Sequence, residues 1–279
     1  MILKAAFRNT TAVLAALSLT LAGCGGGGSG GAGGGVGGPA PSPTPTSTTP
    51  ARLFSDPAAE FLSVADVQRI IAQAVGEAQA RNLPSSIAVV DRVGNVLAVF
   101  QMNGARARAS TSTFISFTGT NNTPPVEAQG VDFASPGGAI AKAITGAYLS
   151  SGGNAFSTRT ASQIVQQHFP PAPITPGLES GPLFGVQFSS LPCSDLNTRF
   201  LAGGGTAALI GPKRSPLGLA ADSGGFPIYK NGVVVGGIGV MGDGDYGFDP
   251  NVLDTDADAE EFIALAGIQG FAPPDNILA

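Results

Sequence analysis

The sequence is poor in the residues that carry the commonest catalytic and redox chemistry. Its 279 residues include no tryptophan, one histidine and two cysteines. A Ser-His-Asp triad would therefore have to be built around His168. Cys24 belongs to the N-terminal segment, so Cys193 stands alone in the rest of the chain. This excludes a disulfide within the domain that follows the N-terminal segment.

Charged residues are also scarce, at 12% of the chain, and acids outnumber bases. The formal net charge is −5 and the sequence pI is about 4.8. Binding to nucleic acid requires concentrated lysine and arginine. The charge balance therefore argues against nucleic-acid partners.

Residues 1–23 predict an export signal. Lys4 and Arg8 supply a positively charged start, and Thr11–Leu21 is apolar but too short to span a bilayer. The ending Leu21-Ala-Gly-Cys24 resembles a bacterial lipobox, in which Cys24 is acylated and becomes the mature N-terminus. Gly25 in place of aspartate indicates the outer membrane by the same resemblance. The alternative is an ordinary cleaved signal with an incidental cysteine.

Residues 24–55 predict a disordered tether. They are first rich in glycine and then alternate proline with serine and threonine, so neither half can bury apolar surface. The remaining residues, 56–279, suffice for one domain with a substantial core. We expect the tether to hold this domain clear of a membrane that the protein contacts only through its lipid anchor.

Two β-hairpins organise the domain. The apolar, β-branched runs Ile87–Val90 and Val96–Phe100 flank a turn in which Asp91 is expected to bond backbone amides. Much later, Asn231-Gly232 separates Phe226–Tyr229 from Val233–Val240 and is a strong hairpin signal. Val89 and Val235 are expected to be core residues.

Helical periodicity predicts four helices around these hairpins. They begin at Ser63 with Asp66 in a capping box, at Ala139, and at Thr158 after Ser157, while the last runs through Phe262–Ala266 with Gly267 as its C-cap. The order predicts an α+β fold with a single antiparallel sheet, built from two hairpins, and helices packed on it. Loop-like insertions are expected at about 110–137 and 150–221.

Three blocks resemble the GlcG/HbpS-like haem-binding family, which shares a domain with the C-terminal part of PduO. They are Leu83–Asp91 with Gly94 and Met102–Ala105, then Ala141–Ala147, and then Gly224–Ile228 with Val235–Gly242, completed by the helix that ends in Ala264–Gly267. The resemblance implies a sheet-and-helix fold, frequent homo-oligomers, and binding of haem or a related tetrapyrrole, in some members with slow haem degradation. Gln101, Asn103 and Met241 depart from the family pattern, and the insertions have no counterpart in a compact member.

Few side chains could ligate haem iron. His168 is either a packed residue at a helix end or an axial ligand. Cys193 is either a buried small residue or a thiolate ligand. Met102 and Met241 could offer thioethers, although core packing explains both. We take His168 as the candidate metal ligand.

Lys142 lies off the apolar stripe of its predicted helix. It is either a solvated cation, part of a structural ion pair, or a partner for a ligand carboxylate such as a haem propionate. Arg106 and Arg108 raise the same question. The candidate ligand-binding set is therefore Met102, Arg106, Lys142 and His168.

The acidic run Asp243–Glu261 suggests calcium but fails the EF-hand pattern. With Asp254 as position 1, the required glycine is Ala259 and the required glutamate is Leu265. Acids in the first turn of a helix interact favourably with its dipole, which explains the end of the run. Adventitious calcium binding remains the alternative.

The resulting hypothesis is an envelope lipoprotein that binds haem or a similar small hydrophobic ligand, for capture, storage or sensing. One alternative is an enzyme that degrades haem or processes a small organic acid, which the lack of an evident nucleophile–base pair disfavours. Another alternative is a structural subunit whose insertions dock an envelope protein.

Overall fold

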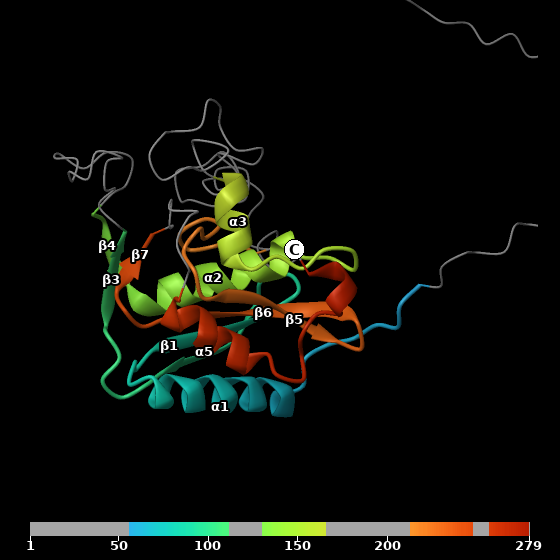
Figure 1. The fold of residues 1–279 in the computed structure, drawn as a ribbon, viewed down its shortest axis with the longest axis horizontal. Coiled ribbons are helices and arrows are strands. Elements are labelled where there is room, and N and C mark those ends of the chain that lie inside the picture. Colours follow the sequence, from blue (N-terminus) through green and yellow to red (C-terminus); the bar gives the residue numbers. More distant parts are fainter. Residues whose placement is uncertain (1–55, 112–129, 166–212, 248–256, 279) are drawn as a thin grey trace, which may run out of the picture. The chain divides into compact units, whose positions relative to one another are not determined.

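The computed structural model describes residues 56–111, 130–165, 213–247 and 257–278. The chain divides into two units, Met1–Leu53 and Phe54–Ala279, and all described residues belong to the second (Figure 1). The predicted signal, the tether and most of both insertions lie outside the described residues. Within the described ranges, no helix has the length and apolar character needed to cross a membrane.

The two predicted hairpins form one antiparallel sheet of four strands. The strands are β1 (Ser86–Asp91), β2 (Val96–Gln101), β5 (Gly225–Lys230) and β6 (Val233–Met241), and their order across the sheet is β2-β1-β6-β5. Asp91 Oδ1 accepts the N–H groups of Val93 and Asn95, which closes the first turn as predicted. Asn231 and Gly232 adopt positive φ in the second turn, where both residue types tolerate this conformation.

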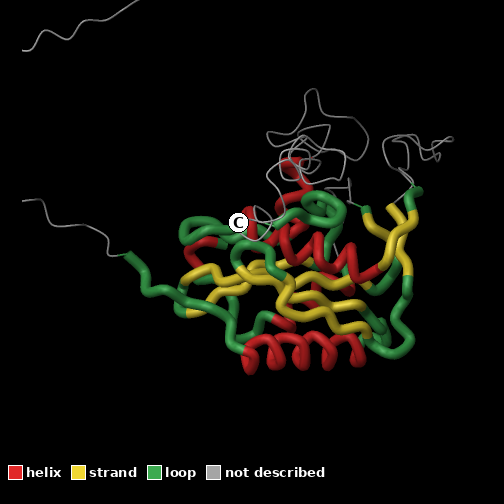
Figure 2. Tube along the Cα trace, turned by 180° about the vertical axis from the view of Figure 1, so that it is seen from behind, coloured by secondary structure: helices red, strands yellow, loops and turns green. Residues whose placement is uncertain are grey.

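Helices cover both faces of this sheet. α1 (Val64–Ala80) and α5 (Ala259–Gly267) pack on one face, and α2 (Ser135–Leu149) packs on the other (Figures 1 and 2). The remaining helices are α3 (Thr158–Val165) and the short η3 (Asp275–Ile277). The α+β prediction is confirmed, with the sheet as the middle of three layers.

The helix ends differ in part from those predicted. The capping box of Ser63 and Asp66 is confirmed at α1, and Ser157 Oγ accepts the Thr160 N–H at α3. α2 begins before the predicted Ala139, because Pro136 stands at its first turn, where proline is pre-organised for a helix. Gly267 is the last residue of α5, and the C-cap is Ile268.

A second, small sheet was not predicted. It consists of β3 (Arg108–Thr111), β4 (Asp132–Ala134) and β7 (Asp245–Tyr246) in the order β4-β3-β7. β3 pairs antiparallel with β4 and parallel with β7. Strands this short carry too few alternating residues for a recognisable pattern. β4 lies inside the predicted insertion at 110–137 and β3 overlaps its start, so this segment is not loop throughout.

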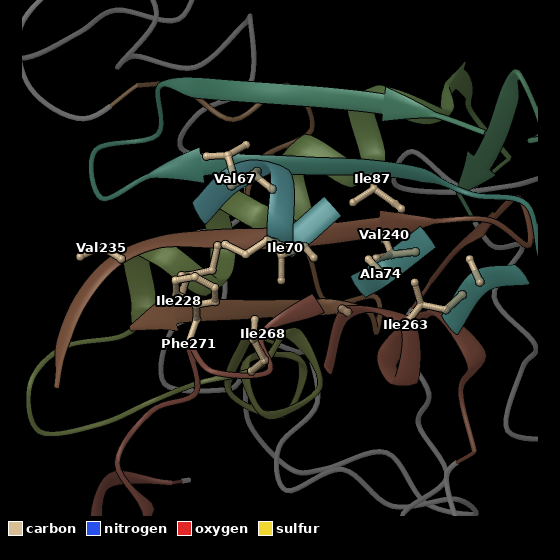
Figure 3. Packing of buried hydrophobic residues seen from close by; sticks show 14 residues of the cluster. Val67, Ile70, Ala74, Ile87, Ile228, Val235, Val240, Ile263, Ile268 and Phe271 are labelled. Carbon is tan, nitrogen blue, oxygen red and sulfur yellow. The ribbon is translucent and has the colours of Figure 1, made fainter. Parts of the chain in front are cut away.

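Alternating residues of β1 contribute to two separate apolar clusters. Ile87 and Val89 pack beneath α1 and α5, whereas Ala88 and Val90 pack beneath α2. Figure 3 shows the first cluster, with Ile70 of α1 and Ile263 of α5 projecting toward the sheet. The expected core positions Val89 and Val235 are both buried. Because the sheet is covered on both sides, β1 is a continuous apolar run.

The glycines of β6 allow α2 to approach the sheet closely. A Cβ atom at Gly237 would lie 2.1 Å from the carbonyl oxygen of Ala143, and one at Gly239 would lie 2.0 Å from that of Ala139. These contacts are with helix backbone, which cannot rotate away as a side chain could. The glycines of β6 therefore mark the place where a helix packs closely on the sheet.

Replacing Gly239 with alanine should lower the free energy of unfolding by about 1–3 kcal/mol, because α2 would have to move off the sheet. The matched control is Gly76→Ala in α1, where nothing lies within 4 Å of the added Cβ. This control should stabilise the protein by about 1 kcal/mol through helix propensity. Denaturation followed by far-UV circular dichroism measures both, and a neutral Gly239→Ala variant would contradict the described packing.

Candidate functional site

Lys142 lies in the middle of α2 and is fully buried. The helix consists mainly of small and apolar residues and packs along β6, so Lys142 enters the interior with them. A buried ammonium loses its hydration and requires anionic partners in compensation. Of the alternatives predicted for Lys142, the solvated cation is wrong and the ion pair is what the structure contains.

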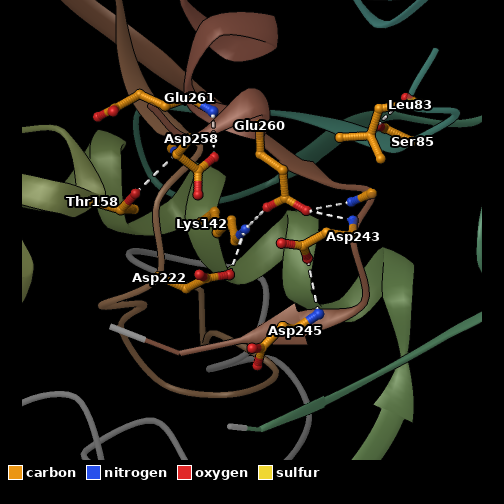
Figure 4. Close-up of polar contacts among 12 residues, drawn as sticks. Leu83, Ser85, Lys142, Thr158, Asp222, Asp243, Asp245, Asp258, Glu260 and Glu261 are labelled. Carbon is orange, nitrogen blue, oxygen red and sulfur yellow. Dashed lines mark hydrogen bonds and ion pairs between the residues drawn. The ribbon is translucent and has the colours of Figure 1, made fainter. Parts of the chain in front are cut away.

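Two carboxylates hold the ammonium of Lys142. Asp222, which precedes β5, places Oδ2 2.6 Å from Nζ, and Glu260 in the first turn of α5 bonds Nζ through Oε2. Figure 4 shows the ammonium between the two carboxylates. All three side chains are at least nine-tenths buried. We call Lys142, Asp222 and Glu260 the lysine cluster.

Glu260 also fixes the turn that follows β6. Its Oε1 accepts the backbone N–H groups of Gly242 at 2.5 Å and Asp243 at 3.0 Å. Gly224 makes room for Glu260, since a Cβ there would lie 2.9 Å from the Glu260 Cβ. The lysine cluster therefore joins α2, the segment before β5, the end of β6 and the start of α5.

The lysine cluster contains two acidic side chains but one basic side chain. Burial raises the pKa of Glu260 to about 7, although Lys142 opposes this effect. Burial also raises the pKa of Asp222 well above its ordinary value, against the same attraction. Burial would lower the pKa of Lys142, but the neighbouring Asp222 and Glu260 outweigh it and raise that pKa. Lys142 is therefore an ammonium shared by two acids.

Tyr246 of β7 lies beside the lysine cluster. Its ring centroid is 6.0 Å from Lys142 Nζ, and Phe133 packs edge-on against the ring at 5.2 Å between centroids. Burial raises the pKa of the hydroxyl above its ordinary value, so this group is neutral. The hydroxyl oxygen is buried without a hydrogen-bond partner among the residues that the structure describes.

The other predicted ligand residues in the described ranges make no ion pair or hydrogen bond with the lysine cluster. Met102 is half-buried and packs against the cluster beneath α1 and α5, and its Sδ accepts the Ser85 N–H at 3.4 Å. Arg106 is exposed and lies against Gly244. Arg108 and Asp132 form an exposed ion pair at 3.7 Å. Lys142 starts from α2, on the face of the sheet opposite to Met102.

Several candidate residues fall outside the described part of the chain, namely Cys24, His168 and Cys193. Met241 is buried and packs beneath α2, as core packing predicts. Within the described ranges, no group of three or more histidine, cysteine, aspartate or glutamate side chains could hold a metal ion. The lysine cluster is therefore a buried ion-pair network in which a cation is already supplied by the protein.

The two acids of the lysine cluster are site residues that the sequence pattern does not reveal. Glu260 belongs to the acidic run considered for calcium and for the helix dipole, and no pattern singles out Asp222. The available signal was Lys142 itself, a charge within a helix of small and apolar residues, which requires anions from elsewhere in the chain. The segments that supply them could not be deduced, because 118 residues separate Lys142 from Glu260.

One protein-family model matches the chain. It is described as "Haem degrading protein HbpS-like" and matches residues 62–113, which include α1, β1, β2 and β3. This match confirms the resemblance to the GlcG/HbpS-like family in that segment. A comparison with curated proteins found no match.

Solved structures are also similar to this chain. A complex of PduOC with haem is 17% identical, covering 75% of this chain and 94% of that chain with a TM-score of 0.37. The Klebsiella pneumoniae protein ORFY is 18% identical, covering 78% and 95% with a TM-score of 0.37. A double mutant of Streptomyces reticuli HbpS is 19% identical, covering 82% and 97% with a TM-score of 0.37.

Replacing Lys142 with methionine should lower the free energy of unfolding by about 3–5 kcal/mol, because two buried carboxylates lose their cation. The matched control is Lys230→Met. Lys230 Nζ lies 2.9 Å from Asp66 Oδ2 in a partly exposed pair, whose loss should cost about 1 kcal/mol or less. Urea denaturation followed by circular dichroism compares the two variants, and equal losses would contradict the importance of the lysine cluster.

Proposed function

Since residues 62–113 match the HbpS-like family model, we propose that the chain binds haem or a related tetrapyrrole at the cell envelope, for capture, storage or sensing. The observation that carries this proposal is the family match over residues 62–113, whose description names haem degradation. Titration with haem tests it directly, because a bound haem absorbs differently from free haem.

The potential iron donors among the described side chains are engaged in other contacts, except the Tyr246 hydroxyl, which is unpartnered but buried and neutral. Met102 Sδ accepts an N–H, and Met241 is buried among apolar residues. The hydroxyls of Tyr148 and Tyr229 donate to backbone carbonyls. Lys142 is an ammonium held by two acids, so it has no lone pair to offer. We therefore propose His168 as the axial ligand, with imidazole as a common donor to haem iron.

The propionates of a tetrapyrrole require cations on the surface. Arg106 belongs to the predicted ligand-binding set and is exposed, and we propose it for this role. Lys142 could reach a propionate only if the new carboxylate displaced Asp222 or Glu260. The new ion pair between Lys142 and the propionate would then have to compensate for the lost pair with Asp222 or Glu260 and for the exposure of the buried lysine cluster.

The N-terminal segment supports a proposed location at the outer membrane. We propose that Cys24 is acylated and that residues 24–55 tether the domain to the outer membrane. A lipid anchor holds through burial of its acyl chains, which contributes about 0.8 kcal/mol per CH₂ group, and two or more chains give stable attachment.

Haem titration of the purified full chain should shift the Soret band and saturate near one haem per chain, with the same detergent lacking protein as the blank. His168→Ala should weaken binding at least about tenfold, because the iron loses a strong donor. Arg106→Gln should weaken binding less and leave the spectrum of the bound haem unchanged. Loss of the band on addition of peroxide would favour the haem-degrading alternative.

Two results would oppose these assignments. No Soret shift with the wild-type chain would overturn haem binding altogether. Unchanged binding by His168→Ala, together with weakened binding by Met102→Leu and Arg106→Gln, would move the site to the surface near Met102. Circular dichroism of each variant shows that the fold is retained.

Replacing Cys24 with serine should release the protein from the membrane fraction, because serine cannot receive the thioether-linked lipid. Fractionation of cells expressing wild-type and Cys24→Ser chains measures this, with Cys193→Ser as the matched control that keeps the proposed anchor. Retention of the Cys24→Ser chain in membranes after a high-salt wash would contradict lipid anchoring.

A further inference from the structure

Strand β2 forms an open and apolar edge of the main sheet. Its sequence, Val-Leu-Ala-Val-Phe-Gln, contains no charge and no proline. Among the described residues, eleven large hydrophobic side chains are exposed, and five of them lie on the β1–β2 hairpin: Val93, Val96, Leu97, Val99 and Phe100. Such clustering on an edge strand marks a surface for pairing with another strand.

The opposite edge of the sheet, formed by β5, is closed. Pro227 lies within this strand, and proline cannot donate a hydrogen bond to an added strand. The N–H of Tyr229 donates to the carbonyl of Phe271 at 2.8 Å, and that of Gly225 donates to Thr158 Oγ1 at 3.0 Å. The chain thus covers the β5 edge of its sheet, whereas the β2 edge is exposed.

The register of β2 shows which of its backbone groups face outward. Met102 N–H donates to the Ser85 carbonyl at 3.1 Å, so this position faces β1. The direction of the backbone N–H and C=O groups alternates along an antiparallel pair. Those of Phe100 and Ala98 therefore also face β1, whereas those of Val99 and Gln101 face away from it. Within the described part of the chain, no backbone group bonds the outward N–H or C=O of Val99.

We propose that β2 pairs antiparallel with β2 of a second copy of this chain, with the two-fold axis at Val99. The outward groups of Val99 then bond those of the other copy, and each Phe100 lies opposite the small Ala98 of its partner. Large and small side chains therefore alternate across the junction, which suits an isologous contact.

The side chains on both faces of the paired β2 strands favour a second copy of the chain as the partner. Val96 and Val99 pair with Val90 and Ala88, so they lie on the α2 face, while Phe100 lies on the other. Apolar side chains are therefore buried on each side of the extended sheet. Because β2 carries no charge, two copies meet without like-charge repulsion, and a strongly charged partner strand finds nothing to pair with.

Cysteine cross-linking of the full chain in its membranes tests the register. Val99→Cys in a Cys193→Ser background should form a disulfide-linked dimer on mild oxidation, since Cα atoms of a hydrogen-bonded antiparallel pair are about 5.5 Å apart. Leu265→Cys is the matched control, because Leu265 is 47% exposed against 42% for Val99 but lies on α5. It should not form the dimer. Equal cross-linking of both variants would overturn the proposal.

Charge substitutions test the same contact in solution. The wild-type chain should sediment as an even-numbered oligomer, and Val99→Lys should reduce its mass by half without changing the circular dichroism melt. Mixing Val99→Lys with Val99→Glu chains should restore the original mass. A monomeric wild-type chain, an unaltered mass of Val99→Lys, or a different protein bound stoichiometrically at β2 would overturn the proposal.

Discussion

The burial of one charge, the ammonium of Lys142, constrains how the domain is assembled. α2 can lie close to the sheet only because β6 presents glycines to it, and this packing carries Lys142 into the interior. Asp222 and Glu260 must then meet it there, since an unpaired buried charge costs far more than the pair contributes. The segment before β5 and the start of α5 are therefore held by α2, which makes distant parts of the chain mutually dependent.

The same cluster shows why a predicted ligand residue can have a structural role. A lysine off the apolar stripe of a helix is equally consistent with solvent, an ion pair or a bound carboxylate. In the structure, Lys142 has two acids within reach, and Glu260 simultaneously bonds Gly242 and Asp243 at the end of β6. The raised pKa values of the acids follow from burial beside a single cation. The shifted pKa values of Asp222 and Glu260 therefore result from packing within the folded chain, because every described partner of the lysine cluster belongs to the chain itself.

Features with a local physical cause could be predicted from the sequence. Asn231-Gly232 sets one hairpin, Asp91 closes the other turn, and Ser63 caps α1, because each acts within a few residues. The small sheet could not be predicted, since β7 has two residues and pairs in parallel with a distant strand. The partners of Lys142 were missed for the same reason: contacts between residues far apart in sequence leave no periodic pattern.

The two edge strands of the main sheet differ in how well they are protected from pairing with other strands. An exposed apolar edge strand invites uncontrolled association, and proteins usually place lysine or proline there or cover the edge. β5 has Pro227 and Lys230 and is bonded by Phe271, so its protection is redundant. β2 has neither residue type, although it is as long as β5 and more exposed. Export and tethering to a membrane would concentrate copies of the domain in one layer, where such a strand persists without aggregation only if it is paired. The unprotected edge is therefore best explained as an edge that is occupied in the assembled protein.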